Sequence, residues 1–331
     1  MKALQYLIAA TMLTFIVSPS YGQEIKDGEY SNPVVAKSLP DPTIIEDNGV
    51  FYLYSTESIR NVPIMCSPDL VNWKFCGTVF TNETRPTFVE GGGIWAPDIN
   101  MIAPGKYVLY YSMSVWGGED SCGIGVAVAD NPLGPWENKG KMFISSEIGV
   151  TNSIDPFYIE EDGIKYLIWG SFRGIYGIEL TEDGLSVNPD AIPVKIAGGA
   201  YEGTYIHKRG GYYYMFASVG SCCAGFNSTY KTVVGRSKHL FGPYVNKAGE
   251  RMLENHHEVV ISGNDTFIGT GHNSEIVTDK AGNDWILYHA YYTGLNNKSR
   301  TLMLDKVIWN EDGWPSVNDG TPASIAIKPV F

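Results

Sequence analysis

Short segments in which apolar and polar residues alternate recur along the whole chain, and most of them are rich in Tyr, Trp and β-branched residues. Such segments favour β-strands, because these side chains fit the pleated surface of a sheet. Gly or Asn stands in the short turns between consecutive segments, as in antiparallel hairpins. No long stretch has the 3.6-residue period of an amphipathic helix. The pattern therefore predicts an all-β protein.

A polar residue stands just ahead of five of these aromatic hairpin patterns. The five residues are Asp41, Asp98, Asp155, Glu202 and His272, at intervals of 47 to 70 residues. Units that repeat at about 40 to 50 residues are typical of propeller blades, and a single hairpin unit cannot bury both of its faces. We therefore predict a five-bladed β-propeller. If each unit begins at the axis, four carboxylates and one imidazole converge in an axial active site.

The last part of the chain completes this architecture. Residues 302–317 give two more strand-like pieces joined by Glu311-Asp312-Gly313, and we expect them to complete the last sheet together with the chain start near Asn32-Pro33. This pairing would close the ring. No linker or low-complexity stretch interrupts the repeats, so residues 23–331 are expected to form a single catalytic domain.

The first 22 residues have the pattern of a secretory signal peptide. Met1-Lys2 precedes a largely apolar run over residues 4–17, and small residues lead to Gly22. The alternative is a buried first helix, which is disfavoured because the segment precedes all the repeats. No cysteine follows the apolar run, so a bacterial lipid anchor has no attachment residue. We expect export to the periplasm or the extracellular space, without a membrane anchor.

The formal net charge is −12. Nucleic acid is an improbable partner, because affinity for phosphate backbones depends on Lys and Arg side chains. A neutral substrate fits best, whereas an acidic polymer would need a local basic patch.

Five cysteines leave at least one without an intramolecular partner. Cys66 and Cys76 could face each other across a hairpin, and Cys122 stands apart. A direct Cys222–Cys223 bond would strain the backbone. None has zinc-ligand spacing with histidine. Packed thiols without a role in the chemistry are the favoured interpretation.

The ordered motifs along the chain resemble those of glycoside hydrolase family 43. The segments NPVVAKSLPDP, GGIWAPDI, NSIDPFYI, YEGTYIHKRGGYYYMFAS, GHNS and VIWNEDGWP carry the resemblance, which covers nearly the whole predicted mature chain. The stretch from Gly220 to Val245 resembles the arabinan endo-1,5-α-L-arabinanases of that family. The resemblance implies a five-bladed propeller and an inverting mechanism.

By the same resemblance, Asp41 would be the general base, Glu202 the general acid, and Asp155 the carboxylate that orients Glu202 and raises its pKa. An inverting glycosidase needs an acid and a base about 6.5–9.5 Å apart, and residues from different blades could meet that need. The alternative for each is an ordinary turn or blade-start residue. The family gives Asp98 no acid or base role, so Asp98 is expected to be structural or to lie beside the substrate. Thr204 departs from the family pattern, in which proline is common after the pair containing the acid.

Several residues are expected to contact sugar. Trp95 is the favoured platform, because a flat apolar face matches the C–H face of a furanose ring. Its alternative is the core of a blade, where most of the eight tryptophans must lie. Asn152 and Ser153 could contact hydroxyl groups. Trp116 and Phe172 are further candidates for the pocket wall.

His272 would, by resemblance, lie near an axial ion, often calcium, that is coordinated mainly by water. Calcium prefers oxygen ligands, so a structural or substrate-orienting histidine is the alternative. No organic cofactor is expected.

The sequence thus predicts a monomeric hydrolase acting on α-1,5-linked L-arabinan or on arabinose side chains of plant pectin. The closest alternative is an exo-acting α-L-arabinofuranosidase or β-xylosidase on the same scaffold. A non-catalytic glycan-binding propeller is the alternative from another class, and the three catalytic-type carboxylates argue against it.

Overall fold

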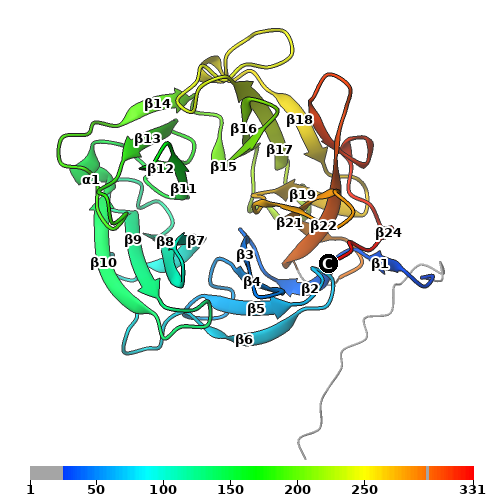
Figure 1. Cartoon of the computed structure of the whole chain (residues 1–331), viewed down its shortest axis with the longest axis horizontal. Coiled ribbons are helices and arrows are strands. Elements are labelled where there is room, and N and C mark those ends of the chain that lie inside the picture. The colour runs from blue at the N-terminus through cyan, green and yellow to red at the C-terminus, as the bar shows by residue number, and fades with distance from the viewer. Residues whose placement is uncertain (1–24, 296–297) are drawn as a thin grey trace, which may run out of the picture.

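The computed structural model describes residues 25–295 and 298–331, and in this part of the chain five antiparallel sheets surround a central axis (Figure 1). This arrangement confirms the predicted five-bladed propeller. The predicted signal segment lies outside the described residues. Among the described residues, no helix is long and apolar enough to cross a membrane.

Four of the blades are four-stranded sheets whose strands follow the chain order from the axis outward. Blade 1 contains β3 (Thr43–Asp47), β4 (Val50–Tyr54), β5 (Pro63–Ser67) and β6 (Lys74–Thr78). Blade 2 contains β7 (Gly93–Ala103), β8 (Lys106–Ser114), β9 (Gly123–Ala129) and β10 (Glu137–Ile144). Blade 3 contains β11 (Phe157–Glu161), β12 (Ile164–Trp169), β13 (Ile175–Glu179) and β14 (Val194–Ala197). Blade 4 contains β15 (Glu202–Arg209), β16 (Tyr212–Val219), β17 (Lys231–Ser237) and β18 (Glu258–Ser262).

Blade 5 closes the ring, because it combines both ends of the repeat region. Its main path is β19 (Phe267–Gly271), β21 (Asp284–Tyr292), β22 (Arg300–Trp309) and β2 (Val35–Ser38), with β20 (Ile276–Thr278) on β21 and β23 (Pro315–Val317) on β22. Asn32 strengthens the closure, since its side chain donates to the Leu304 carbonyl at 2.8 Å and accepts from the Leu304 amide at 2.9 Å. The predicted pairing of the chain start with the last sheet is confirmed.

The remaining elements are short. A two-stranded sheet joins β1 (Glu29–Ser31) to β24 (Ile325–Ile327), and α1 (Ser145–Ile148) follows blade 2. Within the described residues, short 3₁₀ turns lie at Gly225–Asn227, Met252–Glu254 and Asn318–Gly320.

The inner hairpins show why the turn residues recur in the sequence. Asn48 and Gly49 join β3 to β4 with φ values of 52° and 76°. Asp162-Gly163 and Gly210-Gly211 have positive φ at both positions in the equivalent hairpins of blades 3 and 4. Two consecutive positive values define a type I′ turn, whose twist matches that of the paired strands.

Aromatic side chains fill the space between adjacent blades. Trp169 and Tyr110 are fully buried in one cluster, in which Tyr110 of blade 2 stacks on Tyr158 of blade 3 at 5.7 Å between ring centroids. This explains the abundance of aromatic residues, because each one covers a large apolar area between two twisted sheets. The packed blades hold the axial residues in place.

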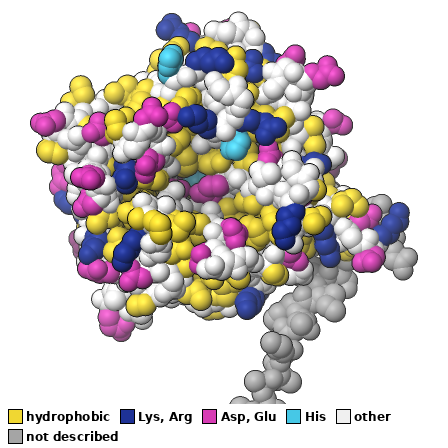
Figure 2. Space-filling model, in the orientation of Figure 1, with side chains coloured by type: hydrophobic (Ala, Val, Ile, Leu, Met, Phe, Trp, Pro, Cys, Tyr) yellow, Lys and Arg dark blue, Asp and Glu magenta, His cyan; other side chains and the backbone are white. Residues whose placement is uncertain are grey.

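The surface charge is uneven. On the face drawn in Figure 2, Lys and Arg side chains gather over blade 4. Among the cations of blade 4, Lys208 pairs with Glu161, Arg209 pairs with Asp284, and Arg236 stacks on Trp314. Lys208 and Arg209 are thus paired with carboxylates and are not free cations for an acidic polymer.

Candidate active site

Three carboxyl groups from three blades line one cavity on the propeller axis. Asp41 precedes β3, Asp155 precedes β11, and Glu202 begins β15. The cavity has a volume of about 330 Å³, and the three residues are 6 to 7 % exposed. Asp41 and Asp155 have φ values of 56° and 59°. A non-glycine residue adopts this region at a cost, and such residues cluster at functional sites.

Asp41 is surrounded by hydrogen-bond donors and positive charge. Arg300 Nη1 donates to Oδ1 at 2.9 Å, and the Thr56 hydroxyl donates to Oδ2 at 2.6 Å. His289 Nδ1 lies 3.2 Å from Oδ1. Burial raises the pKa of Asp41, but the Arg300 guanidinium and the neighbouring imidazoles outweigh burial and hold the pKa well below its usual range. Asp41 is therefore a carboxylate, the form that a general base requires.

Asp155 and Glu202 have the opposite electrostatic environment. Burial raises the pKa of both groups, and the negative charge of Glu202 adds to the rise at Asp155. The Gly203 amide donates to Asp155 Oδ2 at 3.2 Å. This hydrogen bond holds the Asp155 carboxyl beside the backbone that carries Glu202. Because burial and mutual repulsion both disfavour ionisation of the two carboxyls together, the pair favours a state that retains one proton. The pKa of Glu202 is raised, as expected from the sequence, and the pKa of Asp155 is raised as well.

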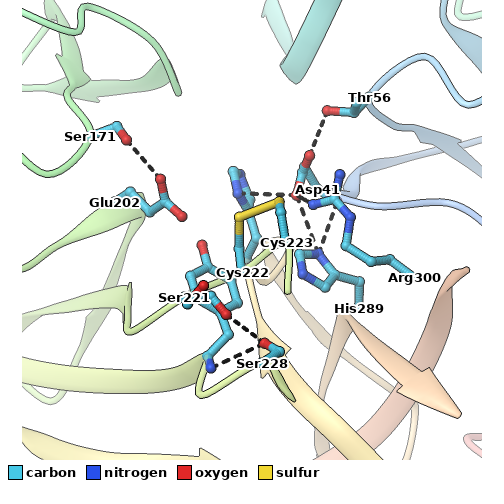
Figure 3. The surroundings of a disulfide bond; sticks show 12 residues. Asp41, Thr56, Ser171, Glu202, Ser221, Cys222, Cys223, Ser228, His289 and Arg300 are labelled. Carbon is cyan, nitrogen blue, oxygen red and sulfur yellow. Dashed lines mark hydrogen bonds and ion pairs between the residues drawn. A yellow bond between two sulfur atoms is a disulfide. The ribbon is translucent and has the colours of Figure 1, made fainter. Parts of the chain in front are cut away.

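Glu202 has further contacts on its own side of the cavity. The Ser171 hydroxyl donates to Glu202 Oε2 at 2.7 Å (Figure 3). The Tyr230 hydroxyl lies next to the same carboxyl and lowers the pKa of Glu202, against the larger effect of burial. These hydroxyls orient the group that would donate a proton.

His272 lies at the boundary between Asp41 and Glu202. Its Nδ1 is 3.4 Å from Asp41 Oδ1, and burial lowers its pKa. The His272 ring also packs against the backbone at Gly203. A Cβ at that position would be only 3.0 Å from the ring, so the glycine leaves room for the imidazole. His272 lines the cavity, as predicted.

A metal ion has few ligands available at this site. Among the described residues, no group of three or more His, Cys, Asp or Glu side chains could hold one. His272 offers a single ring, and the nearest carboxylate, Asp41, already pairs with Arg300. This donor set fits at most an ion whose other ligands are water molecules.

The predicted sugar-contacting residues divide into two groups. Trp95, Trp116, Phe172 and Asn152 line the cavity. The rings of Trp95 and Trp116 are in contact, with centroids 5.5 Å apart, and Trp116 is 78 % exposed. Ser153 does not line the cavity. It is fully buried, and its hydroxyl donates to the Val150 carbonyl and accepts from Trp169.

Asp98 corrects the expectation that all five repeat residues converge. It lies within β7, where it pairs with Tyr110, and it does not line the cavity. Its carboxyl accepts from the Tyr158 amide at 2.7 Å, and burial and the neighbouring Glu275 raise its pKa. Glu275 in turn accepts from the Thr43 hydroxyl at 2.8 Å. These contacts connect inner strands of different blades, so the role of Asp98 is structural.

Sequence reasoning missed Arg300, His289 and Thr56, all of which contact Asp41. His289 stands within a run of apolar and aromatic residues in β21, a strand that is buried except at its last residue, and an imidazole in such a run is a signal that the sequence offers. Arg300 begins β22 and has no motif that marks it. Thr56 also accepts from the Ala96 amide at 2.7 Å, so it connects Asp41 to blade 2.

The cysteines differ from the interpretation as packed thiols. Cys66 and Cys76 form a disulfide between neighbouring strands, as their spacing allowed. Cys222 and Cys223 also form a disulfide, and both line the cavity. Cys122 is free and buried.

Comparison with known proteins identifies the family. The sequence model described as Glycosyl hydrolases family 43 matches residues 30–315. The chain belongs to glycosyl hydrolase family 43. The family residues predicted from the sequence resemblance therefore lie in the matched region, and the chain is a glycoside hydrolase.

Relatives within family 43 have closely similar sequences and folds. An extracellular exo-α-(1→5)-L-arabinofuranosidase of Cellvibrio japonicus is 35 % identical over 309 residues, which cover 84 % of this chain and 86 % of the relative. An extracellular endo-α-(1→5)-L-arabinanase of Bacillus subtilis is 36 % identical over 294 residues, which cover 84 % and 87 %. The structure of a Cellvibrio cellulosa α-L-arabinanase complexed with arabinohexaose has a TM-score of 0.78 at 33 % identity, covering 85 % of this chain and 96 % of that one.

Proposed function

We propose that this family 43 hydrolase cleaves α-1,5-linked L-arabinofuranosyl bonds of arabinan with inversion of configuration. One observation carries the proposal. Within a single cavity, Asp41 is held ionised by Arg300 while the Asp155 and Glu202 pair retains a proton. An inverting glycosidase needs a carboxylate and a carboxylic acid on opposite sides of the bond that breaks.

Each of the three carboxyls has a separate role in this reaction. Asp41 accepts a proton from a water molecule as that water attacks the anomeric carbon. Glu202 donates its proton to the leaving oxygen, and the new hydroxyl group departs with the second sugar. Asp155 supports Glu202, because two ionised carboxyls in this buried site would repel each other, so the pair keeps the proton that Glu202 donates.

The substrate assignment follows from the relatives and from the wall of the cavity. The Cellvibrio japonicus and Bacillus subtilis relatives are named for α-(1→5)-L-arabinofuranosyl linkages. In this chain, Trp95 and Trp116 offer apolar faces suited to the C–H face of a furanose ring. We extend the linkage from the relatives to this chain, and we regard plant arabinan as its source.

The position of cleavage in the polymer is the open alternative, since one relative is an exo enzyme and the other an endo enzyme at nearly equal identity. Digestion of linear arabinan followed by chromatography separates the possibilities. Mixed oligomers indicate endo action, and arabinose alone indicates an exo-acting α-L-arabinofuranosidase. Release from xylo-oligosaccharides but not from arabinan would indicate a β-xylosidase. Binding of arabinan without any release would overturn the proposal in favour of a glycan-binding propeller.

An ion near His272 is a separate part of the proposal. The ring would supply one nitrogen, water would supply the remaining ligands, and calcium is the expected ion. Metal analysis of the purified protein before and after dialysis against a chelator tests this. Retention of full activity and thermal stability by metal-free protein would remove the ion from the account.

Export is also proposed. The relatives from Cellvibrio japonicus and Bacillus subtilis are named extracellular. We extend that location to this chain, with cleavage near Gly22 and a mature single-domain monomer. N-terminal sequencing and light scattering of the exported protein test these statements.

A further inference from the structure

Two adjacent cysteines form a disulfide in the wall of the active site. Cys222 and Cys223 are bonded to each other, and both line the same cavity as Asp41 and Glu202. In Figure 3 the disulfide lies between these two carboxyl residues. Cys222 is half-buried and Cys223 is exposed, so neither residue is enclosed in the core. The catalytic mechanism described above assigns no role to this group.

The segment that carries the disulfide is anchored at both ends. The Ser221 amide donates to the Thr229 hydroxyl at 3.0 Å, and the Ser228 hydroxyl donates to the Ser221 carbonyl at 2.6 Å. From blade 5, the Tyr291 hydroxyl donates to the Cys222 carbonyl at 3.2 Å. These contacts fix the position of the disulfide relative to blades 4 and 5.

The disulfide belongs to the blade that supplies the general acid. Ser218 of β16 pairs with Glu202 of β15, and Cys222 follows only four residues later in the chain. At the other end of the segment, Tyr230 places its hydroxyl beside the Glu202 carboxyl. Because the acid protonates the leaving oxygen, groups on this side of the cavity face the sugar that leaves.

A disulfide differs chemically from the other groups on that wall. Its two polarisable sulfur atoms carry no proton, so they cannot donate a hydrogen bond to a sugar hydroxyl. They suit the C–H face of a furanose ring through dispersion and exclusion of water. Trp95 and Trp116 offer the same kind of surface from blade 2.

From this geometry we propose that the Cys222–Cys223 disulfide forms the sugar-contacting surface of the leaving-group subsite. The inference rests on the proposed function, because it assumes that the leaving group is a second arabinofuranosyl unit. The disulfide acts as a binding surface and takes no part in proton transfer. It therefore affects affinity for substrates that place a sugar beside Glu202.

Kinetics on two substrates test the proposal. The variant Cys222→Ser/Cys223→Ser should raise KM for an arabino-oligosaccharide about tenfold, the low end of what loss of a small apolar contact costs, with little change in kcat. α-L-Arabinofuranosyl fluoride places no sugar in the leaving-group subsite, so its kcat/KM should change less than about twofold. The matched control is Cys66→Ser/Cys76→Ser, which removes the disulfide outside the cavity and should leave both KM values unchanged.

Reduction gives a second measurement that does not depend on the folding of the Cys222→Ser/Cys223→Ser variant. In the Cys66→Ser/Cys76→Ser background, the Cys222–Cys223 bond is the remaining disulfide of the described residues. Treatment with a phosphine reductant should raise KM for the oligosaccharide, and removal of the reductant followed by reoxidation should restore it. An unchanged KM for the oligosaccharide in Cys222→Ser/Cys223→Ser, or after reduction, would overturn the inference. Equal losses on both substrates would also overturn it, because they would indicate a general disturbance of Glu202. Failure of the unmodified protein to cleave arabino-oligosaccharides would instead refute the proposed function.

Discussion

Arg300 Nη1 donates a hydrogen bond to Asp41 Oδ1 at 2.9 Å across 259 residues of sequence. This contact lets a carboxyl that is only 7 % exposed remain ionised. On the other side of the same cavity, Asp155 and Glu202 have no comparable cation within hydrogen-bonding distance among the described residues, and their pKa values are raised. One cavity therefore maintains two opposite protonation states, as a paired acid and base require.

Removing either catalytic carboxyl should abolish turnover without unfolding the protein. Asp41→Asn and Glu202→Gln are each expected to lower kcat on arabinan by at least about 10³-fold, because each removes a proton transfer while keeping the shape of the side chain. Asp98→Asn is the matched control, since Asp98 has the same repeat position but lies outside the cavity. That variant should keep kcat within about tenfold. Retention of more than about a tenth of the original rate by Asp41→Asn or Glu202→Gln would exclude that residue from its role.

The acid and the base can be distinguished by the leaving group. An aryl arabinofuranoside with a good leaving group needs little protonation, so Glu202→Gln should lose much less activity on it than on arabinan. Asp41→Asn should be equally impaired on both substrates. The comparison requires kcat/KM for each variant on each substrate. Equal losses for Glu202→Gln on the two substrates would contradict its assignment as the acid.

The Arg300 contact should set the acidic limb of the pH profile. Arg300 lowers the pKa of Asp41, and Asp41 must be ionised to act as a base. Arg300→Met should therefore shift the acidic limb of kcat/KM to higher pH by about one unit or more, whereas Arg300→Lys keeps the charge and should shift it less. A full pH profile of both variants checks this. An acidic limb at the same pH in Arg300→Met would show that another group controls it.

Asp305 should make stability fall as pH rises through the weakly acidic range. Burial raises its pKa to about 7, while it accepts from the Tyr288 hydroxyl and the Ala323 amide. The unfolded chain loses this proton near pH 4, whereas the folded protein keeps it until about pH 7. The folded state is thus favoured at pH 4, and this contribution is lost as pH rises from about 4 to about 7.

Asp305→Asn removes that titration. The variant should show a flatter dependence of unfolding free energy on pH over this window than the parent protein, as measured by denaturant unfolding at several pH values. Parallel curves for the two proteins would show that Asp305 titrates normally.

The sequence predicted the propeller because its signals are local and repeated. Type I′ turns such as Asn48-Gly49 recur in the inner hairpins of blades 1, 3 and 4, and aromatic strands follow them at short spacing, so both signals can be read from local sequence. Blade-start residues were also readable, since Asp41, Asp155, Glu202 and His272 do meet in one cavity. Asp98 was misplaced because β7 begins five residues earlier, at Gly93, so Asp98 lies within the strand and pairs with Tyr110, whereas Asp41 and Asp155 precede their strands.

The other missed features depend on long-range packing. Arg300 reaches Asp41 only because the last sheet packs beside the first, and no local pattern marks that contact. Ser153 is next to Asn152 in sequence, yet Ser153 is buried in the core whereas Asn152 lines the cavity. The Cys222–Cys223 bond was disfavoured on grounds of local strain, whereas the anchored segment from Ser221 to Thr229 holds the two residues together.

The stereochemistry of the first product tests the central claim most directly, since the account has one water molecule attacking between Asp41 and the anomeric carbon. Proton NMR during the first minutes of arabinan hydrolysis should show the β-anomer of the new reducing end before mutarotation, starting from an α-linkage. Initial appearance of the α-anomer would contradict the account, because it would require a nucleophilic carboxylate about 5 Å from the acid and a covalent intermediate.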